Sequence, residues 1–173
     1  MPSSAANAKA LYRESFGHHG VFCLRFPREF LPEEDTEKPE APLPYLRWTV
    51  YPSREEKKLA VLGVGPHGLA LKGLLEQKEA DFAYFDALYL NPLPFEDLQE
   101  LASYPEILLY DAYGTKTGFA ESVLSSLMEL GYSGRIKVLA VPNEFIPFDS
   151  KDNQERQFGL LPEQALEAAL SLL

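Results

Sequence analysis

The stretch KLAVLGVGPHG, residues 58–68, decides the fold of this chain. It opens with an apolar run up to Val64, and such a run is typical of a parallel strand buried on both faces. Glycines at 63, 65 and 68 then frame a turn, and residues 69–78 have the pattern of a helix. A strand that leads through a tight turn into a helix begins a βαβ unit, so this stretch predicts a parallel sheet.

The same alternation of strand and helix continues on both sides of this stretch. It predicts an α/β fold with a mainly parallel sheet that is covered by helices on both faces. In such sheets, ligands meet the carboxyl ends of the strands. Strands are predicted at 46–51, 82–90, 106–112 and 135–141, helices at 95–103, 119–130 and 161–173, and carboxyl-end loops at 63–68, 91–94, 112–118 and 142–147.

The first 45 residues have a different character. Residues 5–16 carry apolar side chains at helical spacing, and residues 20–26 read as an apolar strand that Pro27 stops. Residues 29–45 combine four prolines with six acidic residues. Repelling charge and missing backbone donors keep such a stretch extended, so we interpret it as a linker.

Composition excludes several classes of function. The chain has 173 residues, 16 Lys and Arg against 26 Asp and Glu, and a net charge of −10, which argues against nucleic acid and anionic membranes as partners. A single cysteine excludes an intramolecular disulfide. The apolar runs are too short for a membrane span and no signal peptide is visible, so we expect a cytoplasmic globular domain.

Two loops resemble phosphate-binding motifs. Residues 63–68 have the spacing G-x-G-x-x-G of a dinucleotide site, but Pro66 removes one backbone donor, so a plain tight turn into a helix is favoured over nucleotide binding. Residues 114–118, GTKTG, could cradle an anion at a helix N-terminus. They lack the P-loop spacing, so a polar loop with a helix cap is favoured there.

The remaining candidate residues form no catalytic set. Three histidines, at 18, 19 and 67, are predicted to lie on the surface or in turns, and Cys23 is predicted to be a buried, inert thiol. Asp111 ends a strand, but one carboxylate does not make an acid–base pair. Arg25 and Arg28 could grip a phosphate, although a surface salt bridge is the favoured interpretation. The absence of a catalytic set of residues is consistent with one domain of a larger enzyme.

Several segments, in order along nearly the whole chain, resemble the C-terminal part of 1-deoxy-D-xylulose-5-phosphate synthase, a thiamine-diphosphate enzyme of the transketolase superfamily. No single motif is specific, but their order and spacing are. The segments are LRFPR at 24–28 for R-[YF]-P-R, KLAVLGVG at 58–65, DALYLNPL at 86–93 for D-x-R-[FW]-x-K-P-[LI], GFAE with Leu124 for G-V-x-E-x-L, PNEFIP at 142–147 and FGL at 158–160.

The resemblance implies a three-layer α/β/α sandwich, like the transketolase C-terminal domain, on a five-stranded, mostly parallel sheet with one antiparallel strand. It divides the chain into residues 1–28, closing a preceding pyrimidine-binding domain, the linker at 29–45, and the domain proper at 46–173. The implied parent enzyme, a transferase and a homodimer, condenses pyruvate with glyceraldehyde 3-phosphate, with loss of CO2, to make a precursor of isoprenoids and thiamine. Arg28 is the residue expected to bind the substrate phosphate.

Departures from the family pattern fall at the carboxyl edge of the sheet. Glu29 replaces the glycine after R-[YF]-P-R, Leu88 stands at the family's arginine, and Asn91 stands at its lysine. The chain also lacks the G-D-G motif that holds Mg²⁺ and the cofactor, so no cofactor is expected in this chain. Thiamine diphosphate and Mg²⁺ would be bound by other domains of the parent. We therefore expect a divergent fragment, inactive alone; the alternative is a non-catalytic subunit-interaction module related to the C-terminal domains of 2-oxoacid dehydrogenases.

Overall fold

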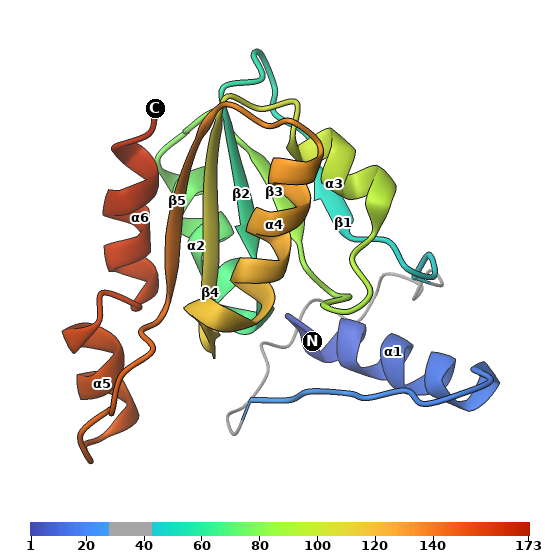
Figure 1. Ribbon diagram of the computed structural model, residues 1–173. Coiled ribbons are helices and arrows are strands. Elements are labelled where there is room, and N and C mark those ends of the chain that lie inside the picture. The colour runs from blue at the N-terminus through green and yellow to red at the C-terminus, as the bar shows by residue number, and fades with distance from the viewer. Residues whose placement is uncertain (28–42) are drawn as a thin grey trace.

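A computed structural model describes residues 1–27 and 43–173 of the chain. It confirms the α/β class, with five strands in one sheet and helices on both sides (Figure 1). The elements are α1 (Ala5–Gly17), β1 (Thr49–Tyr51), β2 (Leu59–Gly63), α2 (Gly65–Gln77), β3 (Ala83–Asp86), α3 (Phe95–Leu101), β4 (Glu106–Thr115), the helical turn η1 (Lys116–Ala120), α4 (Glu121–Glu129), β5 (Arg135–Val141), α5 (Lys151–Gln157) and α6 (Pro162–Leu170).

The strand order across the sheet is β1-β3-β2-β4-β5. The predicted buried strand β2 lies at the centre, where Val61 pairs in parallel with Tyr84 of β3 and with Leu108 of β4. All five residues of β2 are buried, as a doubly covered strand requires. The edge strand β1 runs antiparallel to β3, which confirms the mostly parallel sheet with one antiparallel strand.

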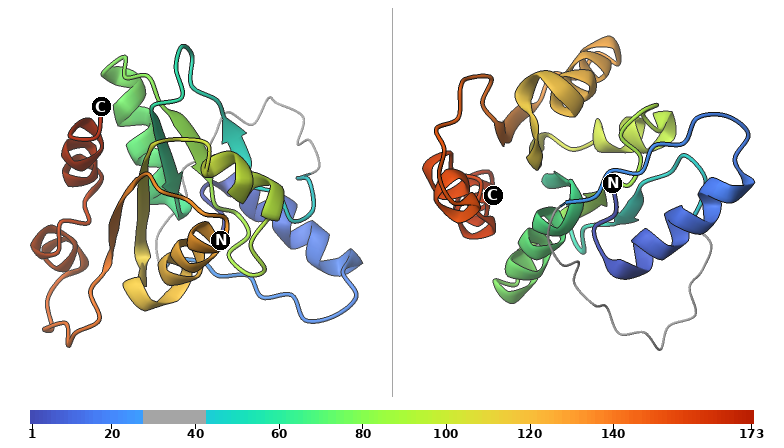
Figure 2. Two further views of the ribbon diagram at one scale, coloured as in Figure 1. Left: turned by 45° about the horizontal axis from the view of Figure 1, so that its top comes forward. Right: turned by 90° about the horizontal axis from the view of Figure 1, so that it is seen from below.

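Helices cover both faces of the sheet (Figure 2). On one face, α2 and α6 pack through Leu71, Leu75 and Ala165 onto β2 and β4. On the other face, α3 and α4 pack through Leu101 and Leu127, together with Trp48 before β1. The helices contribute side chains at spacings of three and four residues, which places one apolar stripe against the sheet.

The glycines of residues 63–68 are explained by close packing between strand and helix. A Cβ added to Gly68 would lie 2.8 Å from the backbone carbonyl carbon of Gly63, so the first turn of α2 can approach β2 only without a side chain. Gly65 has a φ of +64°, which glycine adopts without strain. The predicted tight turn into a helix is therefore confirmed.

Helix α1 lies outside the three layers, at the edge of the sheet where the parallel strands end (Figure 1). Its N-cap is Ser4, whose hydroxyl accepts a hydrogen bond from the backbone N–H of Asn7. Its one buried apolar side chain, Leu11, packs against Leu88 and Tyr89 after β3. This small separate cluster fastens the beginning of the chain to the carboxyl edge of the sheet.

Several sequence predictions need correction. Residues 20–26 form no strand, because this segment runs extended beside α1 and does not pair with the sheet. Its side chains still alternate, and Phe22 and Leu24 point inward. Cys23 is therefore exposed and not buried. The loop at 114–118 is instead the end of β4 followed by η1, and α5 was not predicted, since its residues carry almost no apolar side chains.

None of the helices within residues 1–27 and 43–173 combines the length and apolar character that a membrane crossing requires. In the same residues, no group of three or more His, Cys, Asp or Glu side chains is placed to hold a metal ion.

Candidate functional site at the carboxyl edge of the sheet

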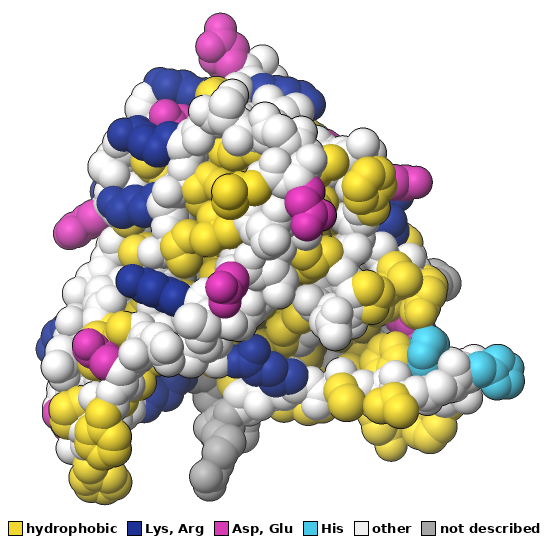
Figure 3. Space-filling view, viewed as in Figure 1, with side chains coloured by type: hydrophobic (Ala, Val, Ile, Leu, Met, Phe, Trp, Pro, Cys, Tyr) yellow, Lys and Arg dark blue, Asp and Glu magenta, His cyan; other side chains and the backbone are white. Residues whose placement is uncertain are grey.

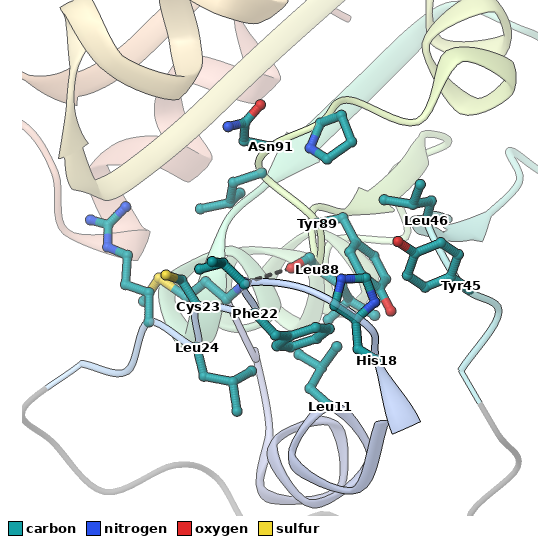
Figure 4. A pocket seen from close by; sticks show the side chains of 15 residues that line it. Leu11, His18, Phe22, Cys23, Leu24, Tyr45, Leu46, Leu88, Tyr89 and Asn91 are labelled. Carbon is teal, nitrogen blue, oxygen red and sulfur yellow. Dashed lines mark hydrogen bonds between the residues drawn. The ribbon is translucent and has the colours of Figure 1, made fainter. Parts of the chain in front are cut away.

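A cavity of about 430 Å³ opens at the carboxyl end of β3. Four parts of the chain line it: Met1, helix α1 with the extended segment that follows it, the residues before β1, and the loop after β3 (Figure 4). Its deepest side chains, Leu11 and Leu88, are 1% and 2% exposed. We call this feature the edge cavity; it is lined by Met1, Leu11, His18, residues 21–25, Tyr45, Leu46 and residues 88–92.

Four rings follow one another along one wall of the edge cavity. The ring of His18 lies 5.4 Å from that of Phe22 and 5.8 Å from that of Tyr45, and Tyr45 lies 6.0 Å from Tyr89, measured between centroids. Two of these contacts are edge-to-face, an arrangement that aromatic quadrupoles favour. Figure 4 shows these labelled rings gathered on one side of the cavity, with Cys23 on the other side.

Tyr89 is held in place through its side chain and through its backbone. Its hydroxyl donates to a carboxylate oxygen of Glu14 on α1, at 2.5 Å, and its backbone carbonyl oxygen accepts from Nε1 of Trp48 at 2.8 Å. Burial and the hydrogen bond to Glu14 raise the pKa of the Tyr89 hydroxyl well above its ordinary value, so it stays neutral. Glu14 thereby places a carboxylate beside these four rings, which we call the aromatic wall.

A second link joins α1 to the sheet through Asp86, the last residue of β3. The Asp86 side chain is 2% exposed and accepts hydrogen bonds from the Ser3 hydroxyl at 2.5 Å and the Asn7 amide at 3.3 Å. Because a buried carboxylate needs such donors, these contacts fix the position of α1 relative to the strand ends. The edge cavity exists because α1 is held there.

Arg25 and Asp111 lie near each other at the end of β4. The guanidinium of Arg25 donates to the backbone carbonyl of Tyr113, and its positive charge acts on the buried carboxylate of Asp111. Oδ1 of Asp111 accepts from the N–H of Tyr113 at 3.1 Å, whereas Oδ2 has no hydrogen-bond partner among the described residues. Burial outweighs these favourable contacts and raises the pKa of Asp111.

A chain of three side chains connects the strand ends to α5. The hydroxyl of Tyr113 lies 2.5 Å from Nδ1 of His67, and Nε2 of the same histidine lies 3.0 Å from a carboxylate oxygen of Glu155. The His67 side chain is only 13% exposed, so this histidine lies in the predicted turn into α2 but not on the surface. Sequence reasoning missed the chain because Glu155 is 88 positions away, on a helix that no pattern predicted.

The other predicted residues have mixed outcomes. Arg28, the predicted phosphate ligand, lies outside the described residues, so its role stays a prediction. His19 is exposed and His18 lines the edge cavity. Leu88 and Asn91, which stand at the family's arginine and lysine, both line the edge cavity. Two of the positions at which this chain departs from the pattern thus meet in one place, while the third, Glu29, lies outside the described residues.

The sheet order, its single antiparallel edge strand and the helices on both faces define a domain of the transketolase C-terminal type. Solved structures support this fold assignment. A split-gene transketolase in an inactive beta4 tetramer matches 99% of this chain and 57% of its own, with a TM-score of 0.79 and 20% identity. A transketolase variant from Pichia stipitis matches 99% of this chain and 24% of its own, with a TM-score of 0.64 and 14% identity.

Comparison with the sequences of known proteins identifies the family within this fold. The 1-deoxy-D-xylulose-5-phosphate synthase of Azobacteroides pseudotrichonymphae is 31% identical over 132 residues, which are 74% of this chain and 21% of that protein. The enzyme of the same name from Thermus thermophilus is 25% identical over 173 residues, 99% of this chain and 27% of its own. No known family profile matches the chain.

The chain is therefore a divergent relative of the 1-deoxy-D-xylulose-5-phosphate synthases, with the fold of a transketolase C-terminal domain. It spans only about a fifth to a quarter of the length of the relatives that it matches.

Proposed function

We propose that this chain serves as the C-terminal domain of a thiamine-diphosphate-dependent enzyme of the 1-deoxy-D-xylulose-5-phosphate synthase type, acting in the cytoplasm. The reaction joins two carbons of pyruvate to glyceraldehyde 3-phosphate and releases CO2. The observation that carries the proposal is the 31% identity over three quarters of the chain to an enzyme of that name. The chain's part is to support the homodimer and to form one edge of the substrate site.

Exposed apolar side chains support a role as part of a larger assembly. Tyr12 and Phe16 on α1 are 56% and 75% exposed, and Val21 and Phe26 in the following segment are 91% and 49% exposed. Figure 3 shows hydrophobic side chains gathered around α1 and this segment, at the lower right of the molecule. A contiguous apolar surface of this kind is typical of a contact with other protein domains.

We assign thiamine diphosphate and Mg²⁺ to the remaining domains of the enzyme. A hard divalent cation needs several oxygen ligands, and the sequence has no G-D-G motif to supply them. Within this chain, we assign Arg28 to the phosphate of glyceraldehyde 3-phosphate, because a guanidinium matches the fork of phosphate oxygens. On this proposal the chain alone forms no product.

A chimera tests the proposal. The segment of the Thermus thermophilus enzyme that aligns with 99% of this chain is replaced by the chain, and product formation from pyruvate and glyceraldehyde 3-phosphate is measured. We expect activity from the chimera and none from the chain alone. The change Arg28→Ala in the chimera is expected to raise KM for the phosphorylated substrate by about tenfold or more. Arg54→Ala, which removes the same charge before β2, serves as the control.

The replaced residues at the carboxyl edge favour a second candidate, a non-catalytic subunit-interaction module. Leu88 and Asn91 remove two cationic groups that the family places there. If the chain is such a module, the chimera assembles to the size of the natural enzyme and forms no product. An unchanged KM after Arg28→Ala would remove the phosphate assignment alone and leave the role of the domain standing.

A further inference from the structure

The edge cavity has the size and the interior of a small-molecule site. Its volume of about 430 Å³ lies within the range of roughly 300–1,000 Å³ that is usual for such sites. Leu11 and Leu88 form an apolar floor, and Leu24 and Leu46 add partly buried apolar surface. These apolar side chains favour a ligand whose body is apolar, and polar groups of the same lining, among them the Met1 amino group and the Asn91 amide, are available to its polar end.

The aromatic wall narrows the class of ligand further. His18 stands between Phe22 and Tyr45, and Tyr45 meets Tyr89 edge to face. A planar ring placed in the cavity would extend this series of ring contacts, and such pairs are favourable beyond the area that they bury. An aliphatic ligand of equal size lacks this contribution.

Charge around the cavity disfavours a phosphate ester. Among the described residues, the lining contains no lysine, and its arginine, Arg25, already donates to the carbonyl of Tyr113 and lies near buried Asp111. The terminal amino group of Met1 also lines the cavity, but it donates to the carbonyl of Leu88, and burial lowers its pKa to about 6. Glu14 places a carboxylate behind the aromatic wall, on the hydroxyl of Tyr89. A dianion that enters would lose its hydration and would have to compete with the Tyr113 carbonyl and the Asp111 carboxylate for the Arg25 guanidinium, which is costly in a buried site.

We infer that the edge cavity is a binding site for a neutral, single-ring aromatic molecule. Asn91 lines the cavity and is exposed, so its amide can hydrogen-bond a hydroxyl or carbonyl group of such a ligand at the mouth. The site goes beyond the proposed function, because it stands on the described lining residues whether or not Arg28 binds a substrate phosphate. Its ligand class is set by rings and apolar side chains, and not by cations.

Binding is tested on the full chain with two probes that share the benzyl ring, the neutral benzyl alcohol and its phosphate ester, benzyl phosphate. The readout is a titration followed by NMR, with the methyl signals of Leu24 and Leu88 as reporters. We expect saturable shifts of both reporters with benzyl alcohol, and a dissociation constant at least about tenfold higher for benzyl phosphate. Tighter binding of benzyl phosphate, no shifts with either probe, or shifts that never saturate would overturn the inference.

Substitutions locate the binding. Leu88→Arg places a guanidinium in the cavity and should weaken benzyl alcohol by about tenfold or more while favouring benzyl phosphate. Because Leu88 is buried, this variant can fail to fold, so Asn91→Lys at the exposed mouth is the second variant. We expect Asn91→Lys to strengthen benzyl phosphate about fivefold, and Asn143→Lys, the same change in an exposed loop after β5, to leave both constants unchanged. Equal effects of the two lysine variants would show that the probes bind elsewhere.

Discussion

Nε2 of His67, in the first turn of α2, lies 3.0 Å from Oε2 of Glu155, in the middle of α5. Glu155 is 8% exposed although α5 is short and otherwise mostly polar at its surface. The pair therefore joins α5 and the loop before it to the body of the domain. Lys151, one turn earlier on α5, lies 3.5 Å from the other carboxylate oxygen.

The first prediction concerns this link. Glu155→Ala should loosen α5 and increase amide hydrogen exchange across residues 151–157, with a loss of about 1–3 kcal/mol of local stability, because His67 loses a buried charged partner. Glu167→Ala on the exposed side of α6 is the matched control. If α5 exchanges equally fast in both variants, the His67–Glu155 contact does not hold the helix.

The second prediction concerns the attachment of α1. Ser3→Ala removes the hydroxyl that donates to Asp86 at 2.5 Å, so we expect a loss of about 1–2 kcal/mol in the free energy of unfolding, measured by urea denaturation. The edge cavity should also change, since α1 forms one side of it. Ser125→Ala on the exposed side of α4 should change stability by less than about 0.5 kcal/mol. A loss no greater than that of the control would mean that the other α1 contacts suffice.

Sequence patterns predicted the sheet well for a physical reason. Strand β2 is a continuous apolar run, and β4 and β5 are rich in apolar residues, between helices of regular period. This local pattern is enough to fix the place of the three strands in the layers. Strand β3 is shorter than predicted, because the chain leaves the sheet after Asp86 to meet α1. That departure depends on a contact with a residue far away in the sequence.

The candidate site could be predicted only in part, for the same reason. The position of the site at the carboxyl edge follows from the parallel sheet, and Leu88 and Asn91 could be identified from their place in the motif. The aromatic wall could not be predicted, because His18, Tyr45 and Tyr89 come together only when α1 packs against the loop after β3. The buried position predicted for Cys23 was wrong because apolar neighbours also occur in an extended segment that pairs with no strand.

The third prediction follows from that correction. The Cys23 thiol is exposed, so it should react with a disulfide reagent such as 5,5′-dithiobis(2-nitrobenzoate) in the folded protein within about tenfold of the rate in denaturant. The reaction is followed by absorbance with one equivalent expected, since the chain has a single cysteine. A thiol that becomes reactive only on unfolding would place this segment against the sheet, as the sequence first suggested.

The fourth prediction is a dependence of stability on pH that arises from Asp111. Burial raises the pKa of this carboxyl in the folded protein above its unfolded value. The folded state therefore binds more protons than the unfolded state between the two values, and the contribution of Asp111 to stability falls as pH rises through the folded pKa. The loss of stability caused by burying the Asp111 charge is absent below the unfolded pKa and fully present at pH values above the folded pKa.

Asp111→Asn tests this sign, because it removes the charge and keeps an oxygen to accept from the N–H of Tyr113. The variant should gain stability relative to the natural chain as pH rises from about 4 to about 8, in urea denaturation followed by circular dichroism. Asp152→Asn, at an exposed position of α5, should show no such gain with pH. The difference in free energy of unfolding between Asp111→Asn and the natural chain could instead stay constant across this range or shrink as pH rises. Either result would mean that the positive charge of Arg25 stabilises the buried carboxylate and that burial does not penalise it.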